Sequence, residues 1–261
     1  MGRTFKKVAI IGGGPGGLVL AKLLDDFPDK FVRATIFEAS ARLGGKVLTR
    51  SFGSAPAIFE AGVAELYDYS HLGQDPLKEL VVGLNLKTIP MTGRTVILGE
   101  KIIANRAALG RHFGSKTATE TSKFYRTCAE LYSPADYYIE DWQIDRHHAW
   151  ADRRFSELLN EIEDQTARKY VTVASRTDIA TEPYLTSALN GLKNVLMDDQ
   201  RYIRLYSIKG GIERLIDRLA AEISAEVRLN SPVLKIGRTR AGRIASRCGE
   251  SIERSPKSLT L

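Results

Sequence analysis

Residues 7–38 read KVAIIGGGPGGLVLAKLLDDFPDKFVRATIFE, and this stretch decides the fold of the chain. Residues 7–11 form a short, mainly apolar run followed by glycines, which is typical of a buried parallel strand. Residues 18–27 carry apolar side chains at helical spacing and stop before a proline, so a helix is expected there. Residues 32–38 predict a second strand. Strand, glycine turn, helix and strand make a βαβ unit, which indicates an α/β fold.

The turn between the first strand and the helix has the spacing G-x-G-x-x-G, with Gly12, Gly14 and Gly17 in the fixed places. The first glycine allows a tight exit from the strand. The second lets a pyrophosphate approach the backbone, and the third lets helix and strand pack closely. Pro15 suits the first helical turn, whose free N–H groups and positive dipole end would face the phosphates. The turn therefore predicts a dinucleotide-binding site.

The second strand ends in an acid, Glu38, about 20 residues beyond the turn, where a carboxylate can accept hydrogen bonds from ribose hydroxyls. The alternative is an exposed carboxylate at the end of a strand. The glycine turn favours the ribose role.

The residues after Glu38 indicate which dinucleotide is bound. Arg42, the pair Gly44-Gly45 and Lys46 follow it, and a second glycine pair lets the backbone pass close to a large cofactor. Arg42 can donate charge-assisted hydrogen bonds to a pyrophosphate. The alternative for Arg42 and Lys46 is a pair of solvated cations.

This pattern resembles flavin-containing amine oxidases and their relatives, among them protoporphyrinogen oxidase and phytoene desaturase. Two further segments are similar to that family: residues 59–62 (FEAG) and residues 206–212 (YSIKGGI). Lys46 stands where the family usually has arginine, so it keeps the charge but loses the planar fork. The resemblance covers residues 7–66 and 205–236, and it implies FAD as the cofactor. The expected cofactor-binding residues are Gly12, Gly14, Pro15, Gly16, Gly17, Glu38, Ala39, Arg42, Gly44, Gly45, Lys46, Gly62 and Val233.

The order of patterns predicts a Rossmann-like FAD-binding domain with an inserted, mostly helical domain. Residues 1–70 are expected to form the first part of the FAD-binding domain, and residues 71–204 the helical insertion that binds substrate. Residues 205–250 are expected to return to the FAD-binding domain through an amphipathic helix at 211–223 and strands at 225–229 and 233–236. Residues 251–261 predict an irregular tail.

By the same resemblance, the C-terminal part of the FAD-binding domain is expected to be missing. Family members continue to a further glycine-rich motif at the flavin and frequently to a catalytic lysine, and neither follows residue 250. We therefore expect no catalytic residue to be assignable in this chain. The first strand would have an unpaired edge, which favours association. A truncated fragment, or one half of a split enzyme with a second chain as partner, is the resulting hypothesis.

Composition narrows the class of protein further. The chain has 261 residues and a formal net charge of +7, which we interpret as a solvated basic surface. No basic stripe alternates with aromatic residues, so no nucleic-acid partner is expected. The two cysteines lie outside any CxxC, no metal site is expected, and no apolar run reaches the roughly 20 residues of a membrane span. A cytoplasmic protein is the expectation.

These observations predict an FAD-dependent oxidoreductase of the amine oxidase type, which oxidises a C–N or C–C bond of a small organic substrate. The first alternative is the inactive fragment or half-enzyme described above. The second is an NAD-dependent dehydrogenase, against which the second glycine pair argues, because an NAD site has no evident need for it.

Overall fold

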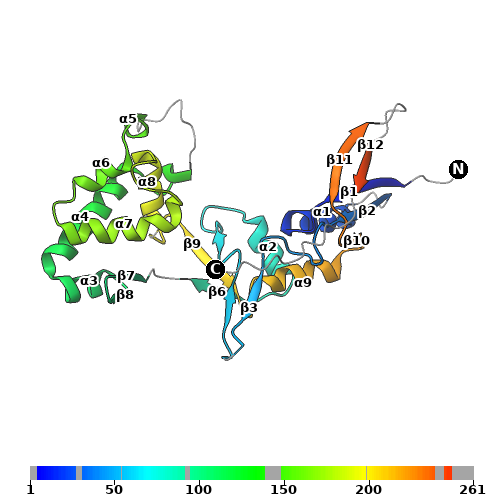
Figure 1. Cartoon of the computed structure of the whole chain (residues 1–261), viewed down its shortest axis with the longest axis horizontal. Helices are drawn as coiled ribbons and strands as arrows, with labels where there is room; N and C mark the ends of the chain where they lie inside the picture. The colour runs from blue at the N-terminus through cyan, green and yellow to red at the C-terminus, as the bar shows by residue number, and fades with distance from the viewer. Residues whose placement is uncertain are drawn as a thin grey trace, which may run out of the picture. The chain divides into compact units, whose positions relative to one another are not determined.

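The computed structural model describes residues 5–27, 31–53, 55–91, 95–138, 148–197, 199–238 and 244–248. It divides into two compact units (Figure 1). Unit 1 consists of Met1–Leu66, Gln74–Ile89 and Tyr206–Leu261, and unit 2 of Tyr67–Gly73 and Pro90–Leu205.

Unit 1 is built on the βαβ segment. β1 (Lys6–Ile11) leads through the glycine turn into α1 (Pro15–Asp26), and β2 (Val32–Phe37) returns parallel to β1. A short strand from far along the chain, β10 (Glu226–Arg228), pairs in parallel with the other edge of β2. Among the described residues, β1 pairs only with β2, so its outer edge is open and Ile11 is 49% exposed.

The remaining elements of unit 1 are short strands and two helices. They are β3 (Thr49–Ser51), β4 (Ile58–Glu60), α2 (Pro76–Gly83), α9 (Glu213–Glu222), β11 (Val233–Arg238) and β12 (Ile244–Cys248). β3 and β4 form one antiparallel pair, and β11 and β12 form another.

The core of unit 1 lies between α1, the sheet and α9. Leu18 and Ala21 of α1, Ile36 of β2 and Leu219 of α9 are completely buried in one apolar cluster. Val81 of α2 belongs to the same cluster. The predicted α/β class is confirmed by this arrangement of helices around a parallel sheet.

Two predicted boundaries differ from the structure. Residues 67–70 were expected in the first part of the FAD-binding domain, but the structure places them in unit 2. Residues 74–89 were expected in the helical insertion, but the structure places them in unit 1. Pro76 starts α2, and the side chain of Asp75 caps it by accepting a hydrogen bond from the N–H of Lys78. Leu84 and Leu86 follow α2 and are buried in the unit 1 core, so apolar packing keeps this segment there.

Unit 2 is mainly helical (Figure 1). It begins with a hairpin of β7 (Val96–Leu98) and β8 (Lys101–Ile103), and a 3-10 turn at Asp136–Tyr138 lies among its helices. The helices are α3 (Arg106–Phe113), α4 (Ser115–Leu131), α5 (His148–Ala151), α6 (Phe155–Asn160), α7 (Gln165–Ile179) and α8 (Ala188–Leu196).

Local capping fixes where several of these helices begin. Asn105, Asp164 and Ser187 each accept a hydrogen bond from the backbone N–H three residues further on, at α3, α7 and α8. α4, α6, α7 and α8 then pack on one another around a continuous apolar core, in which Phe155 is completely buried.

Three strands span the positions in the sequence at which the chain passes from one unit to the other. These are β5 (Leu66–Asp68), β6 (Thr88–Met91) and β9 (Arg204–Ile208), which form a sheet in the order β5-β9-β6. In the part of the chain that the structure describes, no helix combines the length and the apolar character needed to cross a membrane. The predicted tail at 251–261 lies outside the described residues.

Candidate functional site

The glycine turn of unit 1 has the conformation that its spacing predicts. Gly12 has φ +100°, in the region that favours glycine, and its N–H donates to the carbonyl of Phe37 over 2.9 Å. A Cβ on Gly17 would lie 2.0 Å from the carbonyl oxygen of Gly12. Gly12 and Gly17 are therefore required by the fold itself, whatever the turn binds.

Gly14 and Gly16 differ from these two. A Cβ on Gly14 would find its nearest atom, the Cα of Gly45, 3.9 Å away, and a Cβ on Gly16 would find nothing within 4 Å. Neither glycine has a positive φ. The packing of the protein does not require glycine at these two positions, but close approach of a ligand to the backbone would.

The N-terminus of α1 is open. Gly14 occupies the cap position without a side chain, Pro15 follows it, and the first turn has no acidic residue. The N–H groups of the first turn and the positive end of the helix dipole consequently have no anionic partner on this helix. This is the arrangement in which helix N-termini bind phosphates.

Glu38 lies against the same turn. Its Oε2 accepts a hydrogen bond from the N–H of Gly13 over 2.7 Å, and its Oε1 accepts from the N–H and the hydroxyl of Ser40. Partial burial alone would raise the pKa of Glu38. The donors of Ser40 and Gly13 and the charge of Arg42 outweigh that effect, so the pKa lies below its usual range. Glu38 is thus held as a carboxylate, with acceptor capacity left on Oε2.

Arg42 binds the protein's own backbone. Its Nη1 donates to the carbonyls of Leu43 and Val47, and its Nη2 donates to the carbonyl of Gly45. These bonds shape the second glycine pair, in which Gly44 has φ +104° and Gly45 has φ +54°. After these bonds, Arg42 has only its Nε–H and one Nη2 hydrogen left for the predicted pairing with a pyrophosphate.

The two glycine segments lie side by side. The N–H of Gly44 donates to the carbonyl of Gly13 over 2.8 Å, and a Cβ on Gly45 would lie 3.4 Å from the Cα of Gly14. The side chain of Lys46 is exposed, and no described residue forms an ion pair with it. The structure therefore brings the first glycine turn, the second glycine pair and a free cation to one place.

Two distant segments meet beside this loop. A Cβ on Gly62 would lie 1.8 Å from the carbonyl oxygen of Lys46, so residues 60–62 pass close to the second glycine pair. Glu60 accepts hydrogen bonds from the N–H of Ile212 and the hydroxyl of Thr49, both over 2.8 Å. Thr49 also accepts from the N–H of Glu213 and donates its own N–H to the Glu213 carboxylate.

Sequence reasoning did not identify Thr49, Glu60 and Glu213 as a group. Glu60 and Ile212 lie in the two segments quoted for the family resemblance, and this was the only signal that could have paired them. The bond between them spans a separation of 152 residues, which no local pattern reveals.

The segment that leads to Val233 lies beside residues 38–40, which include Ala39. The N–H of Ser231 donates to the carbonyl of Glu38, and the N–H of Asn230 donates to the carbonyl of Ser40. The chain thus passes beside residues 38–40 just before it enters β11, where Val233 is half-buried and Ala39 is exposed. Among the described residues, no group of three or more His, Cys, Asp and Glu is placed to hold a metal ion.

Comparisons with known proteins identify a family and a shared fold. The family model described as flavin containing amine oxidoreductase matches residues 15–254. A search of curated proteins found no match.

Solved structures share the fold at low sequence identity. Putrescine oxidase bound to putrescine matches with a TM-score of 0.67 at 20% identity, covering 94% of this chain and 55% of that chain. A protein from Exiguobacterium sp. 255-15, provisionally assigned as a protoporphyrinogen oxidase, matches with a TM-score of 0.51 at 19% identity, covering 95% of this chain and 57% of that one. The chain spans just over half the length of these structures.

Proposed function

This chain belongs to the family of flavin-containing amine oxidoreductases, and from that premise we propose that unit 1 binds FAD and that the protein is an oxidoreductase of the amine oxidase type. A flavin cofactor is what membership of the family implies. The identity of the dinucleotide, the residues that hold it and the bond that is oxidised are parts of the proposal.

The observation that carries the proposal is the unexplained pair Gly14 and Gly16 at the open N-terminus of α1. The protein itself leaves room for a side chain at both positions. A pyrophosphate that approaches the N–H groups of Gly16 and Gly17 would use this room, and the helix dipole favours its charge. The residues present therefore fit a dinucleotide at this turn.

The rest of the cofactor would follow the residues that surround the turn. The Glu38 carboxylate, oriented by Gly13, would accept a hydrogen bond from a ribose hydroxyl, and Ala39 and Val233 would lie toward the adenine. Gly44, Gly45 and Gly62 would let the backbone pass close to the other half of the molecule. Lys46 supplies a cation without an acidic partner among the described residues, and Arg42 shapes the loop that carries it.

Bound FAD would supply the redox chemistry, accepting a hydride equivalent from a C–N or C–C bond of a small organic substrate, with oxygen or another acceptor reoxidising it. The protein residues would bind and orient the cofactor and keep Glu38 ionised at neutral pH. We propose unit 2 as the part that selects the substrate. Putrescine is the ligand of one structural neighbour, and a primary amine is therefore the first class to test. The cytoplasm stays the proposed location, because the two cysteines suggest no disulfide framework.

The alternative of an NAD-dependent dehydrogenase is less well supported, because Gly44-Gly45 lies against Gly14 and a nicotinamide dinucleotide has no evident need for this second pair. The alternative of a half-enzyme with a partner chain rests on the open edge of β1 and stays a prediction.

The direct test is to purify the chain, add FAD, remove the excess and record the visible absorption spectrum. We expect a yellow protein that releases FAD, identified by chromatography, in a stoichiometric amount on denaturation. A chain that remains colourless but binds NAD⁺ would contradict the proposal. Anaerobic mixing of the holoprotein with primary amines should then bleach the flavin absorbance. If neither amines nor substrates with a saturated C–C bond bleach the flavin of the holoprotein, the proposed oxidoreductase activity is contradicted, while the proposed cofactor binding stands.

A further inference from the structure

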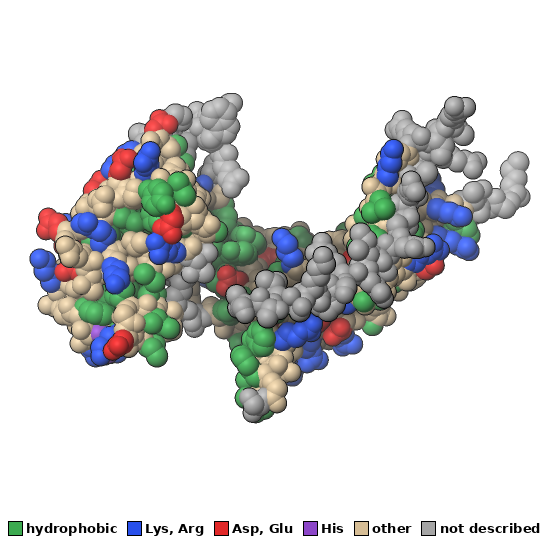
Figure 2. Space-filling view, in the orientation of Figure 1, with side chains coloured by type: hydrophobic (Ala, Val, Ile, Leu, Met, Phe, Trp, Pro, Cys, Tyr) green, Lys and Arg blue, Asp and Glu red, His purple; other side chains and the backbone are tan. Residues whose placement is uncertain are grey.

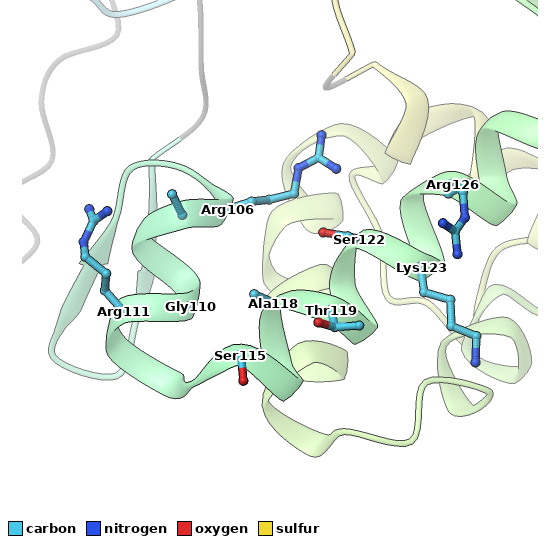
Figure 3. Close-up of a pocket in the computed structure, with 10 residues that line it drawn as sticks. Arg106, Gly110, Arg111, Ser115, Ala118, Thr119, Ser122, Lys123 and Arg126 are labelled. Atoms are coloured by element: carbon cyan, nitrogen blue, oxygen red, sulfur yellow. The ribbon is translucent and has the colours of Figure 1, made fainter.

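A basic groove runs between α3 and α4 in unit 2, apart from every residue proposed to bind the cofactor (Figure 3). Its volume is about 640 Å³, which is within the range of small-molecule sites. Small residues let the two helices approach closely, since a Cβ on Gly110 would lie 3.3 Å from the Cβ of Ala118. The groove is lined by Arg106, Ala107, Gly110, Arg111, Ser115, Ala118, Thr119, Ser122, Lys123 and Arg126.

The charge of this groove is of one sign. Four of its lining residues are Lys or Arg and none is Asp or Glu. By contrast, Figure 2 shows acidic and basic side chains interspersed over the visible surface of unit 2. Ser115, Thr119 and Ser122 recur at helical spacing on α4, so three hydroxyls share one face of that helix. The groove thus offers cations and neutral donors together, which is the donor set that binds phosphate.

Two of the four cations have no ion pair with a described carboxylate, and a third has only a long and exposed one. For Arg111 and Lys123, no ion pair joins them to another described residue, and the ion pair of Arg126 with Glu130 is long, at 4.0 Å, with both side chains more than two-thirds exposed. Arg106 extends toward α4 and lies 5.2 Å from the ring centroid of Tyr125, a cation–π contact that restrains the guanidinium without using its N–H donors (Figure 3).

An adjoining hollow of about 340 Å³ provides an internal comparison. It shares Arg106, Ser122 and Arg126 with the groove, but it is also lined by the carboxylates of Glu130 and Asp199. Its remaining cation, Arg201, is already held by Asp199 through bonds of 2.6 to 3.1 Å. The groove therefore has four cations and no carboxylate, whereas the hollow has three cations and two carboxylates, so the groove favours an anion more than the hollow does.

We infer that the groove between α3 and α4 binds a small ligand that carries at least two phosphate groups. Three of the lining residues are arginines, whose planar guanidinium groups suit bidentate binding of phosphate, and they come from two helices, Arg106 and Arg111 from α3 and Arg126 from α4. A nucleic acid fits less well, because no aromatic side chain lines the groove and bases would have nothing to stack on.

The test uses inorganic pyrophosphate as the probe and isothermal titration calorimetry at low salt on the full chain. The double variant Arg106→Gln/Arg126→Gln removes one arginine of the groove from α3 and one from α4. Lys101→Gln/Lys169→Gln is the matched control, since it removes the same charge from exposed positions of unit 2 outside the groove. Thr119→Glu, which places a carboxylate in the groove, is an independent second variant.

We expect pyrophosphate to bind the native chain and the control alike, and to bind both groove variants at least about tenfold more weakly. The affinity should fall as salt is added. Equal binding by all variants would overturn the inference, because the probe would then occupy another site, such as the glycine turn of unit 1. Absence of saturable pyrophosphate binding would overturn it too. So would a single-stranded oligonucleotide whose binding is weakened by the groove variants while pyrophosphate binding is not. Flavin content measured on the same variants should not change, which separates this inference from the proposed function.

Discussion

Unit 1 and unit 2 are stabilised in different ways. In unit 1, a short parallel sheet, two helices and several loops depend on close backbone approaches at Gly12, Gly17 and Gly62, and its side-chain carboxylates accept hydrogen bonds from distant backbone N–H groups. In unit 2, the helices bury apolar side chains in one continuous core, and α3, α7 and α8 begin at capping residues that sit next to them in sequence.

The two units also differ in the groups that they leave unused among the described residues. In unit 1, Gly14 and Gly16 have room for a side chain at the N-terminus of α1, and the edge of β1 is open among the described residues. Unit 2 has the larger core among the residues described, and Arg111 and Lys123 of its surface groove form no ion pair with a described residue. We therefore expect each unit to respond to its own substitutions and to leave the other intact.

The largest effect should come from Phe155→Ala in unit 2. Phe155 is completely buried, and its ring lies directly against Gly191, so the substitution leaves a cavity. We expect a loss of about 3–5 kcal/mol in the free energy of unfolding. Hydrogen exchange read by mass spectrometry should show lost protection in α6, α7 and α8 but not in α1 and α9. Phe155→Leu, which keeps most of the volume, should cost much less. Equal loss in both units would contradict their independence.

The counterpart in unit 1 is Gly17→Ala. The new Cβ would lie 2.0 Å from the carbonyl oxygen of Gly12, so β1 and α1 must move apart. We expect a cost of about 1–3 kcal/mol, with exchange protection lost in unit 1 alone. Gly16→Ala is the control, because no atom lies within 4 Å of its added Cβ. If Gly17→Ala were as stable as Gly16→Ala, the conclusion that β1 and α1 pack too closely for a side chain at position 17 would be contradicted.

Glu60→Ala tests the link between the β4 segment and the start of α9. The substitution removes the acceptor of the N–H of Ile212, which is completely buried, and an unpaired buried N–H costs about 1–3 kcal/mol. Chemical denaturation should show this loss, and Glu60→Gln should recover part of it because it retains a carbonyl oxygen. If Glu60→Ala left the free energy of unfolding unchanged, water would have to replace the carboxylate as the acceptor.

The smallest effect concerns pH. Because the folded-state pKa of Glu38 lies below its unfolded value, Glu38 stabilises unit 1 at neutral pH, and this contribution is lost as pH falls below about 4.5 toward the folded pKa. Glu38→Gln should be less stable than the native chain at pH 7 and closer to it at pH 3, as measured by urea denaturation. A constant difference between the two proteins across this range would contradict the role of the ionised carboxylate.

Local sequence patterns predicted most of unit 1. The strand expected at 7–11 is β1, the strand expected at 32–38 is β2, and the amphipathic helix expected at 211–223 contains α9. Periodicity and glycine spacing act over a few residues, so they can be recognised without knowing the partner of each element.

The same patterns could not predict contacts between distant segments. The place of α2 in the unit 1 core depends on where Val81 and Leu84 pack, and the meeting of Glu60 with Ile212 depends on how the chain returns after unit 2. The basic groove likewise requires that α3 and α4 fold against each other around Gly114, which has φ +92°. For the candidate site, the glycines and Glu38 were recognisable, but the bonds of Arg42 to the backbone carbonyls of its own loop were not.

The central claim is that unit 1 holds FAD by the backbone at the N-terminus of α1, and Gly14→Ala tests it most directly. The added Cβ has room within the protein, as it does in the control Gly83→Ala at the end of α2, so neither variant should unfold unit 1. The stoichiometry of bound flavin, measured from the visible absorption spectrum after reconstitution, should remain at the native level in Gly83→Ala. In Gly14→Ala it should fall steeply, because the methyl group occupies the space that a pyrophosphate needs. Native flavin content in a folded Gly14→Ala protein would contradict the account.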